Sequence, residues 1–331
     1  MAQKQLYWQR VRGVAILSVV FIHCQSGIHC SYDSFNGISY FILRNIVNFS
    51  VAMFFFLSGY FLKPIDSKMA FYKKRLPRLI IPYCFYTCAY LGMGFVSGKE
   101  ITIKRIMMAF LLGTASTPLY YIVVLTYFTL FAPFLLKAVQ SKKASVIIFL
   151  TSAAFILIAY LFRFAGIDVW DYLKYTPAWL LFYYLGMIIK RYKPTFKISL
   201  LWTLFSVSFI SELISTALLS KVDSSIAYSQ LRFSGIFYSL ILILLAYEYS
   251  KNQKNSDTCK WLSALGDDSY AIYYMHCAFL IIFSKVFTYQ ENMILPVYQF
   301  VEMIFAILVC EIVIFIIRKI NNPKIQMIFG V

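Results

Sequence analysis

The sequence predicts an all-α membrane protein, a bundle of about ten transmembrane helices with both ends of the chain on the cytoplasmic side. Three observations lead to this prediction: the composition, the spacing of apolar segments and the placement of basic residues. Hydrophobic residues make up 61% of the 331 residues, and charged residues make up 14%. Soluble domains average about 25% charged residues. Together with a mean hydropathy of +0.72, this composition places the chain in a lipid bilayer.

Apolar segments of the right length to cross a bilayer recur along the whole chain. A hydrocarbon core about 30 Å thick is crossed by about 20 helical residues. Segments of this kind span residues 11–28, 38–62, 76–97, 118–137, 144–163, 176–190, 198–219, 231–249, 269–287 and 295–317. A shorter apolar stretch, 101–112, is expected to lie at the interface or to re-enter the membrane. No appended soluble domain fits between the segments, so residues 1–331 are predicted to form one transmembrane domain.

The basic residues predict the orientation. If the N-terminus is cytoplasmic, 22 of the 31 lysines and arginines fall in segments on the cytoplasmic side. This bias follows the positive-inside rule and predicts that both termini are cytoplasmic. The net charge of +17 is spread over short clusters between apolar segments. That pattern indicates a bilayer as the partner, and it argues against a nucleic-acid binding face.

Two of the three histidines lie inside predicted spans: His23 in the first and His276 in the ninth. Arg12 precedes His23 by eleven residues, which puts both on one face of a helix, about 16 Å apart along its axis. An ionisable group at that depth is costly unless it faces protein or water. Each histidine could be a neutral side chain that forms a hydrogen bond to a neighbouring helix. A neutral imidazole could equally accept a proton from a hydroxyl, as a general base does.

Two shorter motifs follow. In FFFLSGYFL (54–62), Ser58 and Gly59 interrupt an aromatic run, and small residues there could simply allow close helix packing. In the next loop, Arg75 and Arg78 flank Leu-Pro. If a helix begins near Pro77, these guanidiniums lie at its positive end, an arrangement that binds anions. They could also be ordinary cytoplasmic charge. The seven cysteines show no zinc-ligand spacing, so no metal site is predicted.

These motifs, and their order along the chain, resemble those of the membrane-bound acyltransferase family 3. Bacterial members of that family O-acylate cell-surface and secreted glycans. The resemblance rests on the R-x10-H pattern of Arg12 and His23, the FFFLSGYFL block, the R-x-x-R pair and SYAIYYMH (269–276). PLYYIVVLTYFTLFAPFL (118–135) and FYYLGMIIKRY (182–192) are also similar to the family's middle helices. The similarity therefore runs over nearly the whole chain.

The resemblance implies roles for individual residues. His23 would be the catalytic histidine, and Arg12 would support it or the acyl donor. The phosphates of acyl-coenzyme A would bind to Arg75 and Arg78, while His276 would stand at the catalytic pocket. Further candidate pocket residues are Ser58, Tyr60 and Tyr121.

The expected reaction moves an acetyl group from cytoplasmic acetyl-CoA to a hydroxyl of a cell-surface polysaccharide or its lipid-linked precursor, in a bacterial cytoplasmic membrane. His23 would act as the base or as a transient acyl carrier. Succinyl transfer, the identity of the acceptor and the oligomeric state stay open. The alternative is a transporter or exporter of a glycan or small solute. It would use the intramembrane glutamates Glu212, Glu302 and Glu311, although these could equally be packing partners.

Overall fold

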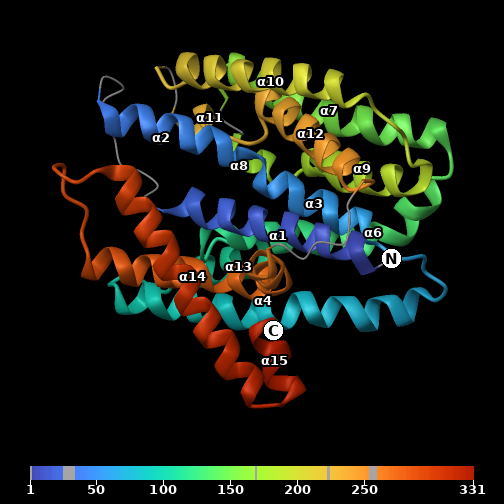
Figure 1. Cartoon of the computed structure of the whole chain (residues 1–331). Helices are drawn as coiled ribbons and strands as arrows, with labels where there is room; N and C mark the ends of the chain where they lie inside the picture. The colour runs from blue at the N-terminus through green and yellow to red at the C-terminus, as the bar shows by residue number, and fades with distance from the viewer. Residues whose placement is uncertain (1, 25–33, 168–169, 222–223, 253–258) are drawn as a thin grey trace. The chain divides into compact units, whose positions relative to one another are not determined.

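A computed structural model describes residues 2–24, 34–167, 170–221, 224–252 and 259–331. Every regular element in these ranges is helical, as the sequence predicts (Figure 1). Seven helical segments in the described part of the chain are long and apolar enough to cross a membrane. The chain is therefore an all-helical, multi-pass membrane protein.

The chain folds into two compact units. Unit 1 comprises Met1–Ser18, Ser31–Pro64 and Ala132–Gly266, and unit 2 comprises Val19–Cys30, Ile65–Phe131 and Asp267–Val331. Unit 1 contains α2 (Phe35–Ile46), η1 (Val47–Phe49), α3 (Ser50–Tyr60), α7 (Lys142–Phe164), α8 (Trp170–Leu173), η3 (Pro177–Trp179), α9 (Leu180–Tyr192), α10 (Ile198–Leu219), α11 (Ser224–Ala227) and α12 (Phe233–Tyr249). Unit 2 contains α4 (Lys68–Val96), α5 (Ile103–Leu112), η2 (Thr117–Leu119), α14 (Leu295–Lys319) and α15 (Pro323–Phe329). Three helices contribute to both units: α1 (Ala2–His23), α6 (Tyr120–Ala138) and α13 (Lys260–Val286).

All ten predicted spans fall on helices. Seven coincide with the long apolar helical segments. The other three lie on α1, on η3 with α9, and on α12, which has 17 residues. The last four residues of the first predicted span, 25–28, lie outside the described residues. The short stretch 101–112 forms the separate helix α5. The number of crossings and the orientation stay predictions.

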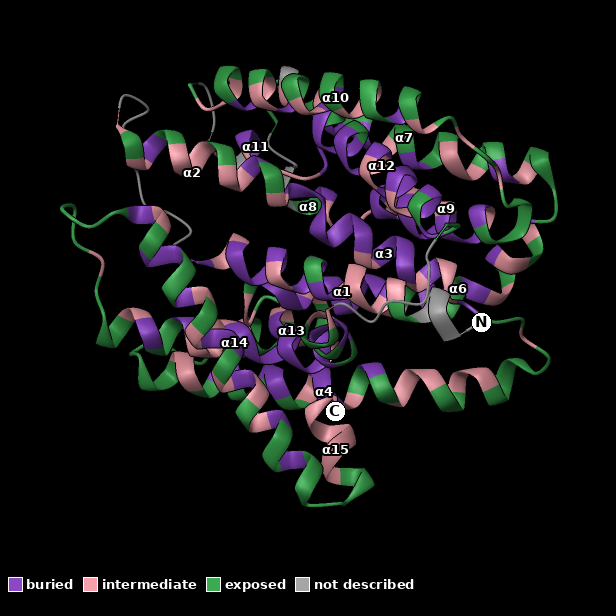
Figure 2. Cartoon of the chain, viewed as in Figure 1, coloured by how far each residue is buried: buried purple, intermediate pink, exposed green. Residues whose placement is uncertain are grey.

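Close packing of α3 against α9 forms the centre of unit 1. A Cβ atom added at Gly59 would lie 1.8 Å from the carbonyl oxygen of Tyr183, and one at Gly186 would lie 2.2 Å from that of Phe56. Because both positions lack a side chain, the two backbones approach directly, as small residues permit in membranes. Figure 2 shows α3 buried along most of its length, whereas much of α10 is exposed and apolar, as a lipid-facing helix is.

Tyrosine hydroxyls bind backbone carbonyls between the helices of unit 2. Pro82 lies inside α4 and has no N–H, so the carbonyl of Arg78 lacks its helical donor. The hydroxyl of Tyr270 on α13 donates to that carbonyl at 2.9 Å, and Tyr274 donates to the next one at 3.1 Å. Tyr83 on α4 donates to the carbonyl of Ala109 on α5 at 2.8 Å. The bond from Tyr270 supplies the donor that Pro82 lacks, and all three bonds tie neighbouring helices of unit 2 together.

Candidate active site

A pocket of about 500 Å³ in unit 2 contains the first predicted histidine. This volume is within the usual range for small-molecule sites. His23 is the last residue of α1, and the rest of the lining comes from α4, the chain from the end of α4 to the start of η2, α13 and α14. The polar lining residues are His23, Tyr90, Ser97, Lys99, Arg105, Ser116, Thr117, Cys277, Ser284 and Glu302. The pocket can therefore bind a ligand that is rich in hydroxyls.

The structure brings the two intramembrane histidines together. The ring centroids of His23 and His276 are 5.3 Å apart, with the ring planes tilted by 44°. His23 is half-buried at the pocket, and His276 on α13 is fully buried. Two helices that are distant in sequence thus place two imidazoles at one point, where a proton could pass between them or a shared ligand.

Hydrogen bonds identify the proton on His276. Its Nδ1 lies 3.0 Å from the carbonyl oxygen of Ile272, which can only accept, so Nδ1 carries the proton. Nε2 lies 3.4 Å from Sγ of Cys277. In the neutral ring, Nε2 therefore has the lone pair and can accept from that thiol.

A tyrosine ring packs beside this histidine. Tyr273 lies 5.9 Å from His276 between ring centroids, and Tyr121 lies 5.1 Å from Tyr273. The hydroxyl of Tyr273 donates to the carbonyl of Pro118 at 2.7 Å, which fixes the ring. Tyr121, a predicted pocket residue, is buried and is not among the described residues that line this pocket.

The prediction that a helix begins near Pro77 is wrong. The helix α4 begins at Lys68, where the hydroxyl oxygen of Ser67 accepts from the amide of Ala70. Arg75 and Arg78 therefore lie within α4, away from its positive end. Proline is tolerated inside a membrane helix when neighbouring groups satisfy the carbonyls it leaves open.

The two arginines nevertheless share a face of α4, because residues three apart are neighbours on a helix. The guanidinium of Arg75 lies 5.6 Å from the ring centroid of Phe71, and Arg78 is exposed. Arg78 precedes the pocket residue Tyr90 by twelve positions, about 18 Å along the helix. They are thus a pair of cations in the N-terminal half of α4, on the same helix as the pocket residue Tyr90.

The other predicted site residues belong to unit 1. Arg12 donates to Oε1 of Gln9 at 3.0 Å and lies over the ring of Phe61 at 5.0 Å. The hydroxyl of Ser58 donates to the carbonyl of Phe54 at 2.8 Å, so its proton is used within α3. Tyr60 lies 5.1 Å from Trp8 between ring centroids. Arg12 and His23 both lie on α1, which is one continuous helix. The prediction that they share a face requires such a helix.

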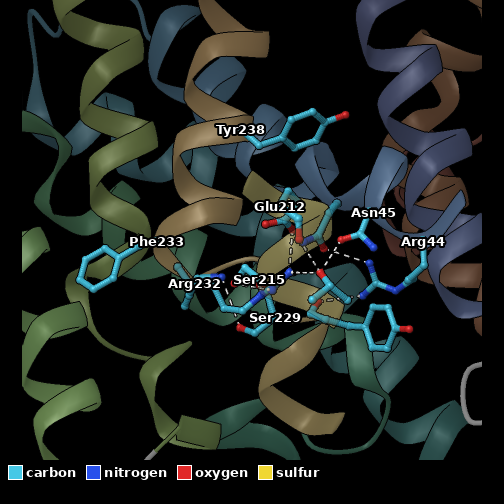
Figure 3. A network of polar contacts seen from close by, with 12 residues as sticks. Arg44, Asn45, Glu212, Ser215, Ser229, Arg232, Phe233 and Tyr238 are labelled. Atoms are coloured by element: carbon cyan, nitrogen blue, oxygen red, sulfur yellow. Dashed lines mark hydrogen bonds and ion pairs between the residues drawn. The ribbon is translucent and has the colours of Figure 1, made fainter. Parts of the chain in front are cut away.

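Glu212 is one member of a buried polar network in unit 1 (Figure 3). Its Oε1 accepts from Nη2 of Arg232 and from Nδ2 of Asn48, both at 2.7 Å, and the ion pair is fully buried. Thr216 donates to Oδ1 of Asn45 at 2.7 Å and accepts from Arg232. These contacts join α10 to η1, α2 and the start of α12. For Glu212 they favour the packing role over an ion pathway.

Comparison with known protein families decides the class. Residues 6–316 match a family described as an acyltransferase domain, the third family of that name. The chain belongs to acyltransferase family 3. No curated protein and no solved structure matches it. As a family 3 member with several membrane-spanning helices, the protein is a membrane acyltransferase, which takes an acyl group from a donor to an acceptor.

Among the residues that line the pocket of this family 3 acyltransferase, sequence reasoning missed Lys99, Arg105 and Cys277. It also missed Tyr273, which packs beside His276. Cys277 follows His276 directly, and this was the available signal. Lys99 and Arg105 were among the nine basic residues expected outside the cytoplasm or within spans.

Proposed function

We propose that this membrane acyltransferase moves an acetyl group from cytoplasmic acetyl-CoA to a hydroxyl of a cell-surface polysaccharide or its lipid-linked precursor, in a bacterial cytoplasmic membrane. The observation that supports this proposal most is the pairing of His23 with His276 at a polar pocket. A sugar hydroxyl needs a base to become a nucleophile, and a neutral histidine supplies one near pH 7.

Two routes use His23 in this reaction. In the first, His23 takes the proton of the acceptor hydroxyl while the oxygen bonds to the thioester carbonyl carbon. The carbon–sulfur bond then breaks, and the coenzyme A thiolate leaves and takes the proton from the imidazolium. In the second, the imidazole nitrogen attacks the carbonyl carbon, the carbon–sulfur bond breaks, and the coenzyme A thiolate leaves with the ring proton. The acetylimidazole then passes its acetyl group to the hydroxyl oxygen, and the hydroxyl proton returns to the imidazole. Both routes conserve the acetyl group and release coenzyme A.

The donor end of the proposal rests on Arg75 and Arg78. Their guanidiniums match phosphate oxygens bidentately, and their shared face on α4 suits a ligand with several phosphates. The pantetheine arm of coenzyme A extends on the order of 15–20 Å, comparable with the helical rise from Arg78 to Tyr90. The thioester could then meet the acceptor near His23.

Removing both guanidiniums should weaken binding of acetyl-CoA. For Arg75→Ala/Arg78→Ala we expect the Kd to rise about 10–100-fold, because charge-assisted bidentate bonds to phosphate are lost. Calorimetric titration of acetyl-CoA into the protein in lipid nanodiscs measures this change. Lys73→Ala/Lys74→Ala is the matched control, since both lysines are exposed on the same helix. Equal losses in the two double variants would contradict a specific phosphate site.

Two cations at the pocket favour an acceptor that carries negative charge. Arg105 donates through Nη1 to the carbonyl of Glu100 at 2.7 Å. A Cβ atom at Gly94 would lie 2.4 Å from Nη2 of Arg105, so the glycine makes room for this guanidinium against α4. Lys99 lines the same pocket and is exposed. A phosphate or carboxylate of the acceptor could bind here while its hydroxyl faces His23.

This arrangement predicts a change in KM. Lys99→Ala/Arg105→Ala should raise the KM for a phosphate-bearing saccharide about ten-fold or more at low salt, with little change for a neutral saccharide, because an electrostatic contact is lost. Initial rates with the two acceptors at fixed acetyl-CoA test it. Lys104→Ala serves as the control, because Lys104 is exposed in the same segment and does not line the pocket. The same change in KM for both acceptors would exclude a role for Lys99 and Arg105 in binding a negative charge on the acceptor.

A further inference from the structure

We propose that His23, His276 and Cys277 form a binding site for a divalent zinc ion, and that zinc bound there blocks the acyltransferase. The ligand atoms of these three residues all lie within 4.8 Å of one another. Cys277 has no part in either route of acetyl transfer. The sequence gives no zinc spacing because the ligands come from two helices, α1 and α13.

The distances are close to those of a zinc site. Zinc lies about 2.0–2.1 Å from histidine nitrogen and about 2.3 Å from cysteine sulfur, in tetrahedral geometry. Two such ligand atoms are then roughly 3.3–3.6 Å apart. Nε2 of His276 and Sγ of Cys277 are already 3.4 Å apart. Closing the remaining separations needs shifts of roughly 1 Å, which side-chain rotation at the half-buried His23 and Cys277 can supply.

His276 is oriented as a metal ligand usually is. Its Nδ1–H donates to the carbonyl of Ile272 at 3.0 Å, which fixes the ring and leaves the lone pair of Nε2 for a metal. Binding replaces the thiol proton of Cys277, which passes to solvent, by a sulfur–zinc bond. His23 and Cys277 both line the pocket, so an ion has access and water can fill the fourth position.

The charges of the pocket set the strength of the site. The thiolate and Glu302, which also lines the pocket, favour a divalent cation, whereas Lys99 and Arg105 oppose it. Three protein ligands leave a fourth position open, unlike the four protein ligands of a closed structural zinc site. The blocking effect rests on the proposed function. A zinc ion on the lone pair of His23 removes the base or acyl carrier.

Cobalt titration tests the site without any need for turnover. We expect Co²⁺ added to the protein in nanodiscs to give a thiolate-to-cobalt absorption band in the near ultraviolet, which Zn²⁺ then removes by competition. Cys277→Ser should abolish this band and weaken zinc binding by about ten-fold or more. Cys88→Ser is the matched control and should retain the band, because Cys88 is an exposed free cysteine on α4. Absence of the band from wild type, or its persistence in Cys277→Ser, would overturn the site.

A second arm tests the block. Zinc should inhibit acetyl transfer by the wild-type protein, and a chelator should restore it. A wild-type protein that forms the cobalt band but keeps full activity in saturating zinc would overturn the inhibitory role. A metal-free wild type without acetyl transfer would count against the proposed function, while the optical titration would still decide the site.

Discussion

Replacing His23 with glutamine is expected to lower acetyl transfer by about 10²–10⁴-fold, the usual contribution of a general base. Glutamine keeps a polar side chain at the end of α1 but offers no basic nitrogen. The Kd for acetyl-CoA should stay within about two-fold of the wild-type value, since the proposed phosphate contacts are on α4. Rates of acetyl transfer and calorimetric titration on the same nanodisc preparation measure the two quantities.

His276→Gln is the matched comparison. A glutamine amide can still donate a hydrogen bond to the carbonyl of Ile272, so we expect the fold to survive and the loss of rate to be smaller than for His23→Gln. Single-turnover labelling with radioactive acetyl-CoA separates the two routes. Acetyl bound to wild type but absent from His23→Gln supports the acyl carrier. If His23→Gln transfers acetyl at the wild-type rate, the histidine pair has a packing role alone.

Hydropathy was sufficient to predict the class of fold. Where the structure describes them, the ten apolar segments lie on helices, because the backbone of a membrane span must satisfy its own hydrogen bonds. Sequence could not predict the division into two units, since it depends on which helices pack together. The contacts of Gly59 with Tyr183 and of Gly186 with Phe56 illustrate this. The sequence alone does not indicate which helix will pack against a given glycine.

The start of α4 shows how local rules fail. Proline favours the first turn of a helix, and this rule placed the helix start near Pro77. The helix instead begins at Lys68 and continues through both Pro77 and Pro82. Tyr270, almost two hundred residues later, supplies the donor for the carbonyl that Pro82 leaves open. Only the tertiary structure shows that a distant tyrosine supplies this hydrogen-bond donor.

The candidate site was predicted in part. Both histidines were singled out because an intramembrane ionisable residue is expected to be functional, and the structure places them side by side. For Cys277, its position directly after His276 was the one signal in the sequence. Tyr273 resembles an ordinary apolar residue of a span, and the approach of Arg105 to Gly94 depends on how the segment after α4 folds back.

Glu212→Gln is expected to destabilise the protein by about 3–5 kcal/mol, because it leaves the charge of Arg232 buried without a counter-ion. Both side chains of this ion pair have 0% exposure. Equilibrium unfolding in mixed micelles of increasing denaturing detergent measures the change. Lys251→Ala is the matched control: Lys251 pairs with Glu248 but is 24% exposed, so we expect a cost of about 0–1 kcal/mol.

The donors of Arg232 explain why the larger loss is expected. Nε donates to the carbonyl of Ser229, Nη1 to the hydroxyl of Ser215, and Nη2 to both Glu212 and Thr216. The neutral partners satisfy hydrogen bonds but do not neutralise the charge, which only Glu212 among these contacts does. Removing both charges with Glu212→Leu/Arg232→Met should therefore recover much of the loss. A cost below 1 kcal/mol for Glu212→Gln would show that solvent reaches Arg232 and that the network does not stabilise unit 1.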